Sequence, residues 1–234
     1  LRPFKFASLN RRPRWQRFIL ALMIGELGLR DQGRVSMSSH AYRGDWSPEA
    51  HQMNVCGPLI GAALWERLQG VQEQVFASLP WIVDQDMDRS THVHAYLWDH
   101  IPRSVFLESY AQIITESYMD GEPGEVFITE KTCKAIANLQ PFIVFGNAGL
   151  LNRLERLGFQ PNSSLAIGYD REQNLGRRLA ALYDALAGLK SMPRHELHDR
   201  YHEEVPALVA NRELLFQMPA TFGHALARRL LETV

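Results

Sequence analysis

The 234-residue sequence predicts an α/β fold, a Rossmann-like parallel sheet flanked by helices with a helical C-terminal region. Two observations predict it. Before Asn174, short apolar segments with strand character alternate with helical patterns, which is typical of a mainly parallel sheet. From Asn174 onward the pattern is helical throughout. We therefore expect a Rossmann-like domain over residues 1–190 and a helical extension over residues 191–234.

The first half of the chain is expected to hold two strands and two helices. Residues 3–9 alternate in hydropathy like a short strand. Pro13 suits the first turn of the helix that follows, because proline lacks only an amide that helix starts leave unpaired. The expected elements are strands at 3–9 and 35–37, helices at 14–29 and 59–76, and an irregular loop at 38–58 rich in Ser, Gly, Pro and His.

The second half repeats the alternation and then becomes helical. Gly158 is well placed to end a helix, and breaks are expected near Pro193, Pro206 and Pro219. The expected elements are a helix opening at 104–108, a strand at 111–116, a strand–helix–strand unit at 126–146, a helix at 150–157, and helices after 174.

Composition limits the classes of function. A net charge of −1 gives no overall argument for nucleic acid or an anionic membrane. Cys56 and Cys133 lie far apart in no metal or redox spacing, so a reducing cytoplasm is the simplest interpretation. The apolar run at 18–24 is too short to cross a bilayer. We found no glycine-rich dinucleotide motif, Walker loop or nucleophile elbow.

The most informative segment is Phe127-Ile-Thr-Glu-Lys-Thr-Cys-Lys-Ala-Ile136. Thr129 is a candidate N-cap, which places Glu130 and Lys131 in the first turn of a helix and Lys134 one turn later. The helix dipole disfavours cations at this end. A bound diphosphate would supply the missing negative charge, and Glu130 could accept hydrogen bonds from sugar or ribose hydroxyls. A solvated helix start with unremarkable charges is the alternative.

This segment, together with Gln140-Pro-Phe-Ile-Val-Phe-Gly146 and Asn10-Arg-Arg-Pro-Arg-Trp-Gln-Arg17, resembles the donor-binding half of fucosyltransferase-like GT-B glycosyltransferases. The resemblance covers about residues 4 to 185. It implies that Glu130 contacts hydroxyls of a nucleotide-sugar donor and that Lys131 contacts its phosphate. Donor-binding residues expected on this basis are Asn10, Arg14, Arg17, Thr129, Glu130, Lys131 and Lys134. The resemblance also favours a metal-independent enzyme, and no cofactor is expected.

GT-B enzymes carry a separate N-terminal acceptor domain, whereas this chain begins where a donor domain would begin. We therefore expect that an acceptor domain is missing from the chain or replaced by another element. Glu116, at the end of an apolar strand, is the candidate catalytic base or donor contact. A carboxylate that accepts backbone amides from the 120–125 loop is the other interpretation of Glu116.

Other constellations carry weaker signals. The basic turn formed by Arg11, Arg12, Arg14 and Arg17 could clamp a phosphate, form a nucleic-acid patch or be solvated. Acidic and histidine pairs could hold a metal, but solvated or packed side chains are the expected outcome. Tyr169 and Asp170 are expected to cap the helix that follows them. The weaker metal candidates are Asp84, Asp86, Asp88, His92 and His94, and the stripe expected to be solvated is His195, His198 and His202.

The sequence thus predicts a cytoplasmic glycosyltransferase that moves a sugar from a nucleotide-sugar donor to an unknown acceptor. The alternative is a non-catalytic nucleotide- or glycan-binding module of a larger protein.

Overall fold

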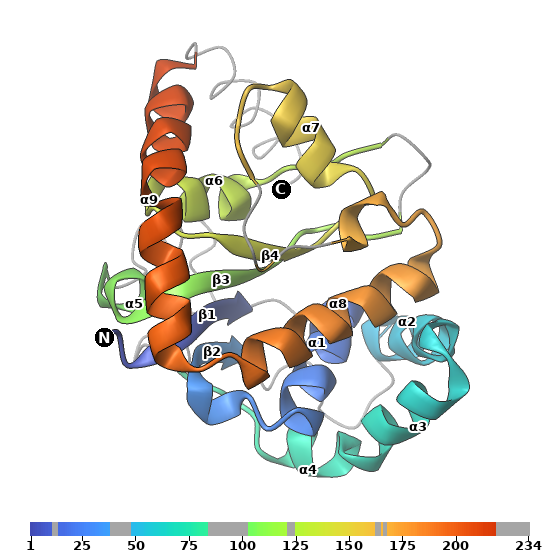
Figure 1. The fold of residues 1–234 in the computed structure, drawn as a ribbon. Helices are drawn as coiled ribbons and strands as arrows, with labels where there is room; N and C mark the ends of the chain where they lie inside the picture. The colour runs from blue at the N-terminus through green and yellow to red at the C-terminus, as the bar shows by residue number, and fades with distance from the viewer. Residues whose placement is uncertain are drawn as a thin grey trace, which may run out of the picture.

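Four parallel strands form the central sheet of the computed structural model, which describes residues 1–10, 14–37, 48–83, 103–120, 125–161, 165 and 168–218. The strand order is β2-β1-β3-β4, and every neighbouring pair is parallel (Figure 1). This confirms the predicted α/β class with a parallel sheet. The strands are β1 (Phe4–Asn10), β2 (Gly33–Met37), β3 (Ser109–Thr115) and β4 (Phe142–Phe145).

Helices connect these strands and follow the last of them. The longer ones are α1 (Trp15–Glu26), α2 (Pro48–Cys56), α3 (Ala62–Gly70), α8 (Leu175–Ser191) and α9 (Arg194–Gln217). The shorter ones are α4 (Gln72–Ala77), α5 (Arg103–Glu108), α6 (Glu130–Ala137) and α7 (Leu150–Arg156), with 3₁₀ turns at Arg30–Gln32, Gly57–Ile60 and Tyr169–Arg171.

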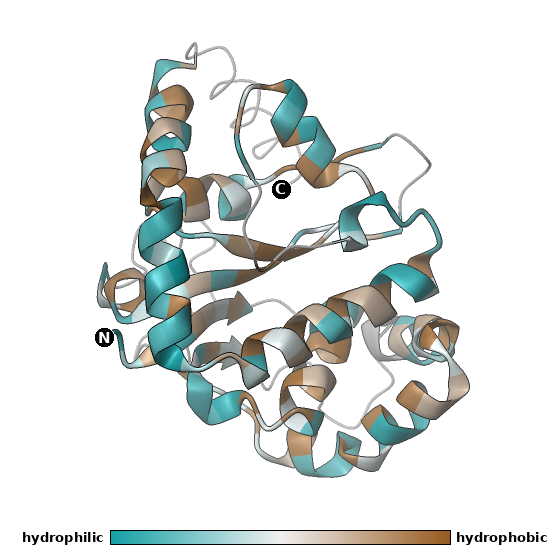
Figure 2. Cartoon of the chain, in the orientation of Figure 1, coloured by the Kyte–Doolittle hydropathy of each residue, from teal (hydrophilic) through white to brown (hydrophobic). Residues whose placement is uncertain are grey.

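Helix α1 lies inside the protein rather than on its surface. Every residue from Trp15 to Ile24 is buried, and α1 contacts α2, α3, α4 and α8. A helix that is apolar on all sides must be covered on all sides. A second layer of helices therefore covers α1 on the side away from the sheet, as Figures 1 and 2 show.

The opposite side of the sheet carries α6 and α9 (Figure 1). Helix α9 packs against α6 and β3 through buried Leu197, Tyr201 and Leu208. Near the amino ends of the strands, Tyr110 accepts a hydrogen bond from the Arg2 amide (2.8 Å), and its hydroxyl lies 3.0 Å from Nδ1 of His198. His198 therefore packs against the core instead of lying in a solvated stripe.

The strand order places a topological switch between β1 and β3. The chain leaves β1 through α1 toward β2 on one side, and leaves β3 through α6 toward β4 on the other. In open α/β sheets the two connections diverge at such a point and leave a crevice at the carboxyl ends of the strands, where ligands bind. The carboxyl ends of β1 and β3 are therefore the first place to look for a site.

The single helix expected at 59–76 is divided into a 3₁₀ turn, α3 and α4, and three further predictions about elements were wrong. Residues 48–56 form α2 instead of part of an irregular loop, with Pro48 at its first position, where proline is favoured. No strand forms at 126–129, because that segment bonds to a side chain instead of a neighbouring strand. The helix at 194–217 continues through Pro206, which is exposed, so water can bind the carbonyl that lost its partner.

Candidate functional site

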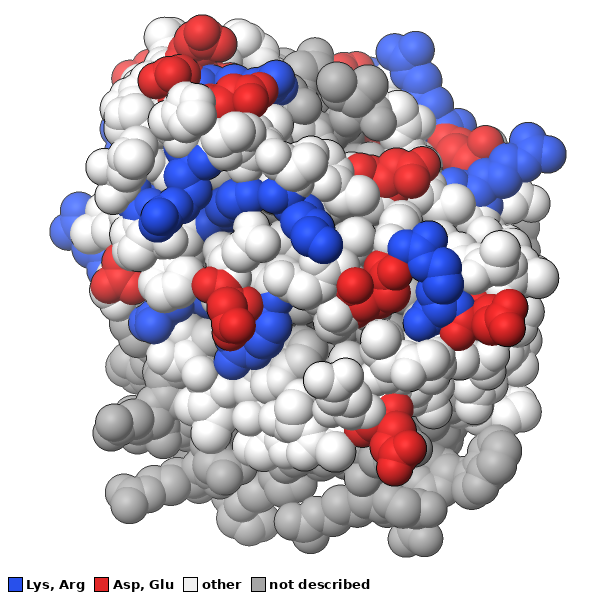
Figure 3. Space-filling view, turned by 60° about the horizontal axis from the view of Figure 1, so that its bottom comes forward, with Lys and Arg blue, Asp and Glu red and all other residues white. Residues whose placement is uncertain are grey.

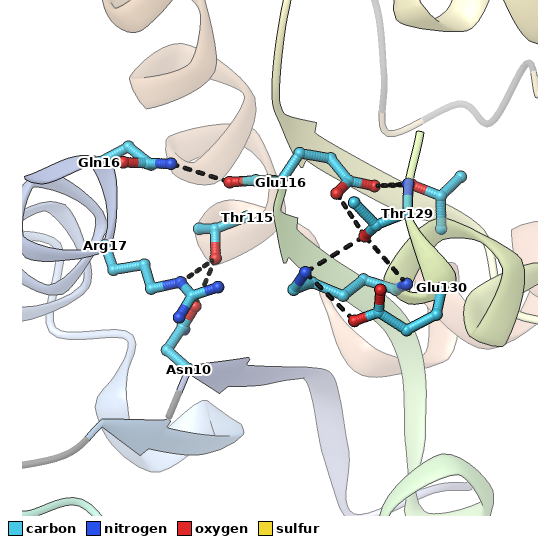
Figure 4. Close-up of polar contacts among 9 residues, drawn as sticks. Asn10, Gln16, Arg17, Thr115, Glu116, Thr129 and Glu130 are labelled. Carbon is cyan, nitrogen blue, oxygen red and sulfur yellow. Dashed lines mark hydrogen bonds and ion pairs between the residues drawn. The ribbon is translucent and has the colours of Figure 1, made fainter. Parts of the chain in front are cut away.

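The carboxyl ends of β1 and β3 are joined by a buried hydrogen-bond network. Asn10 ends β1, and its Oδ1 accepts from the Thr115 hydroxyl (2.6 Å) at the end of β3. Thr115 Oγ1 in turn accepts from Nε of Arg17 (2.9 Å), in the first turn of α1. All three residues are at most 6% exposed. The network fixes a guanidinium at the switch point, as Figure 4 shows.

Gln16 closes the end of β3. The last ladder bond between β3 and β4 runs from the Glu116 amide to the Phe145 carbonyl (2.8 Å). The Glu116 carbonyl accepts instead from Nε2 of Gln16 (2.8 Å), which also donates to the Ser117 carbonyl (3.3 Å). A side chain of α1 thus ends the strand and positions the turn that follows it (Figure 4).

Glu116 anchors the start of α6. Its Oε1 accepts from the Thr129 amide (3.0 Å) and the Thr132 hydroxyl (2.6 Å), and its Oε2 accepts from the Thr129 hydroxyl (2.5 Å). The side chain is fully buried, and bonds from three donors compensate its lost hydration. These donors come from 129–132, while most of the expected 120–125 loop lies outside the described residues. The catalytic role of Glu116 stays a prediction, while these bonds give it a positioning role.

Thr129 is the N-cap of α6, as predicted, because its hydroxyl oxygen accepts from the Lys131 amide (3.3 Å). The same oxygen accepts from Nζ of Lys131 (3.2 Å). Nζ also lies 3.2 Å from Oε1 of Glu130, within ion-pair distance but outside hydrogen-bond geometry, since neither Glu130 oxygen has a hydrogen-bond partner. The two side chains expose only 21% and 15% of their surface. A half-buried pair of opposite charges therefore lies at the tip of α6.

Cys133 lies one turn into the same helix. Burial raises the pKa of its thiol to about 11, and the nearby carboxylates of Glu116 and Glu130 act in the same direction. A thiol with a raised pKa is protonated at neutral pH and is a poor nucleophile. Cys133 therefore has the properties of a packing residue.

The start of α7 is closed by a side chain of the protein itself. Asp170 accepts from the amides of Leu151 (2.9 Å) and Asn152 (3.2 Å). These amides belong to α7, which precedes Asp170 in the chain, whereas Asn174 caps the helix that follows, so the prediction that Asp170 caps the following helix was wrong. Burial raises the pKa of this carboxyl, and the bonds from the helix amides oppose that shift. Tyr169 binds the outer edge of β4, where its hydroxyl oxygen accepts from the Val144 amide (2.9 Å). This helix start is occupied, which leaves the α6 tip as the stronger candidate.

The predicted donor-binding residues come from both sides of the switch point. Asn10 and Arg17 lie in the β1/β3 network, while Thr129, Glu130 and Lys131 form the tip of α6. Arg14 is the half-buried N-cap of α1, and Lys134 is half-buried one turn along α6. The bonds of Glu116 to Thr129 and Thr132 connect β3 to this second group. Predicted site residues that lie outside the described residues are Arg11, Arg12, Asp84, Asp86, Asp88, His92 and His94.

On the face that Figure 3 shows, basic and acidic side chains of the described residues both occur among uncharged ones. Within the described part of the chain, no three His, Cys, Asp or Glu side chains are grouped to hold a metal ion. None of the helices found there is long and apolar enough to cross a bilayer.

Comparison with known proteins adds no relative: no protein-family model, no curated protein and no solved structure matches the sequence. Fold and site together define a parallel α/β protein with a polar, half-buried cluster at the carboxyl edge of its sheet.

Sequence reasoning missed four polar residues at this edge, namely Gln16, Thr115, Thr132 and Asn147. Gln16 could have been noticed because it interrupts the apolar sequence of a helix that is buried on all sides. The roles of Thr115 and Thr132 depend on contacts between segments far apart in the chain. Asn147 is a buried residue just after β4.

Proposed function

We propose that the carboxyl edge of the sheet binds a nucleotide-sugar and that the protein is a GT-B-type glycosyltransferase that transfers the sugar to an acceptor. The single observation that carries the proposal is the tip of α6, where Glu130 and Lys131 form a half-buried pair 3.2 Å apart. An ion pair between surface charges contributes little to the stability of a protein. A ligand with phosphates and hydroxyls would use both groups.

Four of the predicted residues have a specific role in this proposal. Lys131 and Arg17 would face the diphosphate, because an ammonium and a guanidinium stabilise the charge that develops on a departing diphosphate. Glu130 would accept from hydroxyls of the sugar or ribose. Glu116 would hold Thr129 and the first turn of α6 in place, and preorganised donors are what such stabilisation needs.

A non-catalytic binding module is the second candidate. The observation that favours it is the state of Glu116, whose carboxylate already accepts three hydrogen bonds. A general base must be able to take a proton from the acceptor. If Glu116 only positions α6, the base would come from elsewhere or be absent, and binding would occur without turnover.

Thermal denaturation with UDP, GDP, CDP and their sugars tests the proposal, because a ligand that binds only the folded state raises its melting temperature. We expect one nucleotide class to raise the melting temperature of the wild-type protein. Lys131→Ala should abolish that rise, whereas Lys190→Ala, at an exposed position of α8, should retain it. A rise that survives Lys131→Ala would contradict the site.

Turnover separates the two candidates. The nucleotide-sugar that binds is incubated with the protein, and release of the nucleoside diphosphate is measured with and without candidate glycan acceptors. Release above the rate of the Lys131→Ala variant supports transfer or hydrolysis. Binding with no release under any condition supports the module.

A further inference from the structure

Three side chains at the carboxyl edge hold buried oxygen atoms that accept no hydrogen bond within the described part of the chain. These atoms are Oε1 of Gln16, Oδ1 of Asn147 and both carboxyl oxygens of Glu130. Gln16 and Asn147 expose only 1% and 5% of their surface. A buried polar group without a partner costs about 1–3 kcal/mol, so a group of them in one region calls for an explanation.

All three side chains belong to segments that adjoin Glu116. Gln16 donates to the Glu116 carbonyl, and Glu130 follows Thr129, whose amide binds the Glu116 carboxylate. Asn147 follows Gly146, at which an added β-carbon would lie 3.6 Å from Cβ of Glu116. The side-chain amide of Gln16 has a fixed orientation, since its nitrogen donates to two carbonyls, so the unpartnered atom is an acceptor.

We propose that these oxygens form a subsite for a polyhydroxylated group and that Asn147 is a specificity residue that accepts a hydrogen bond from a ligand hydroxyl. The inference rests on the proposed function and adds which part of the donor this part of the edge takes. Phosphate oxygens cannot satisfy acceptors, because they are acceptors themselves. A metal cation is disfavoured, because the Lys131 ammonium already lies beside Glu130. Sugar hydroxyls supply the missing donors without charge.

The first test needs no ligand. Asn147→Leu keeps the branched shape of the side chain and removes the unpartnered acceptor, so the unliganded variant should melt about 2–4 °C above the wild type. Asn54→Leu, at an exposed position of α2, is the control and should shift the melting temperature little. Melting of the Asn147→Leu variant below the wild type would overturn the inference.

The second test compares two ligands by calorimetry, the nucleotide-sugar and its parent nucleoside diphosphate. Asn147→Leu and Asn147→Ala should weaken the nucleotide-sugar at least about tenfold, because a buried hydrogen bond to the ligand is lost. Binding of the nucleoside diphosphate, which carries no sugar, should stay within about twofold. Equal weakening of both ligands, or of neither, would overturn the subsite and leave the proposed function standing.

Free monosaccharides at high concentration distinguish failure of the subsite from failure of the proposed function. If no nucleotide or nucleotide-sugar binds the wild type, the proposed function fails, and the monosaccharides then decide the subsite. A thermal shift with one of fucose, glucose, mannose or N-acetylglucosamine in the wild type that Asn147→Ala removes supports it. No shift with any of them overturns it.

Discussion

Replacing Glu116 by glutamine should destabilise the protein by removing the anchor between β3 and α6. The glutamine oxygen can still accept from the Thr129 amide and the Thr132 hydroxyl, which both bind Oε1 of Glu116 in the wild type. Its amide nitrogen then faces Oγ1 of Thr129. The Thr129 hydroxyl oxygen already accepts from Lys131 N and Nζ, so it has no room for the new amide donor. The Thr129 hydroxyl proton also loses the carboxylate oxygen that accepts it in the wild type.

The magnitude follows from the kind of bond that is lost. Hydrogen bonds to a charged group contribute about 1.5–3 kcal/mol each, against about 0.5–1.5 kcal/mol for neutral pairs. Glu116→Gln loses one charged bond and weakens two others, while the neutral amide costs less to bury. The free energy of unfolding should therefore fall by about 2–4 kcal/mol.

Urea unfolding followed by tryptophan fluorescence measures this change, since Trp15, Trp65 and Trp81 are buried. The urea midpoint should fall with an unchanged slope, because the surface exposed on unfolding is unchanged. Glu66→Gln, at an exposed position of α3, is the matched control. A loss below about 0.5 kcal/mol for Glu116→Gln, the range of ordinary surface substitutions, would refute the reasoning.

Three further predictions concern packing and titration. Gly176→Ala should lower the free energy of unfolding by about 2 kcal/mol or more, since its β-carbon would lie 1.8 Å from the Leu59 carbonyl oxygen. Gly188→Ala lies in the same helix with no atom in reach of the added β-carbon, and it should raise the free energy of unfolding by about 0.5–1 kcal/mol. Urea unfolding that ranks the two variants in the other order would contradict the packing of α8. Cys133, whose pKa rises from 9.0 to about 11, should hold about 100-fold less thiolate than a free thiol. Iodoacetamide should therefore modify Cys133 slowly in the native protein and quickly in urea, as measured by peptide mass spectrometry. Rapid labelling of the native protein would contradict the raised pKa. Burial raises the pKa of Asp170 above 3.8, so the folded state keeps this proton to higher pH than the unfolded state does. Stability therefore falls as the pH rises from the unfolded-state pKa through the folded-state pKa. Urea midpoints measured across acidic pH should fall less for Asp170→Asn than for the wild type, and an equal fall would contradict the raised pKa.

Local sequence signals predicted the parts of the site that depend on local structure. Thr129 is an N-cap in the structure because a hydroxyl before a helix binds the amide two residues later, whatever the tertiary fold. Gly158 adopts the left-handed backbone expected after α7, with φ of 93°. The parallel sheet followed from alternation of strand and helix patterns, which reflects burial on both faces.

The parts that sequence reasoning missed depend on contacts between distant segments. Glu116 and Thr129 are thirteen residues apart, and no periodicity links them. Gln16 meets the Glu116 carbonyl one hundred residues away. The segment at 126–129 has strand-like residues, yet its Thr129 amide binds a carboxylate instead of a strand. Pro206 was expected to end a helix, but Tyr201 and Leu208 pack on either side of it, and tertiary packing outweighs the local cost.

The central claim is that a ligand with phosphates and hydroxyls binds where β1, β3 and α6 meet. Amide chemical shifts of the full chain, recorded by NMR with and without the best nucleotide-sugar, test it most directly. The account predicts shift changes concentrated at residues 14–17, 116–118 and 129–134. Changes confined to the groove between α6 and α9, which Pro141, Phe142 and Leu208 line, or no changes at saturating ligand, would contradict it.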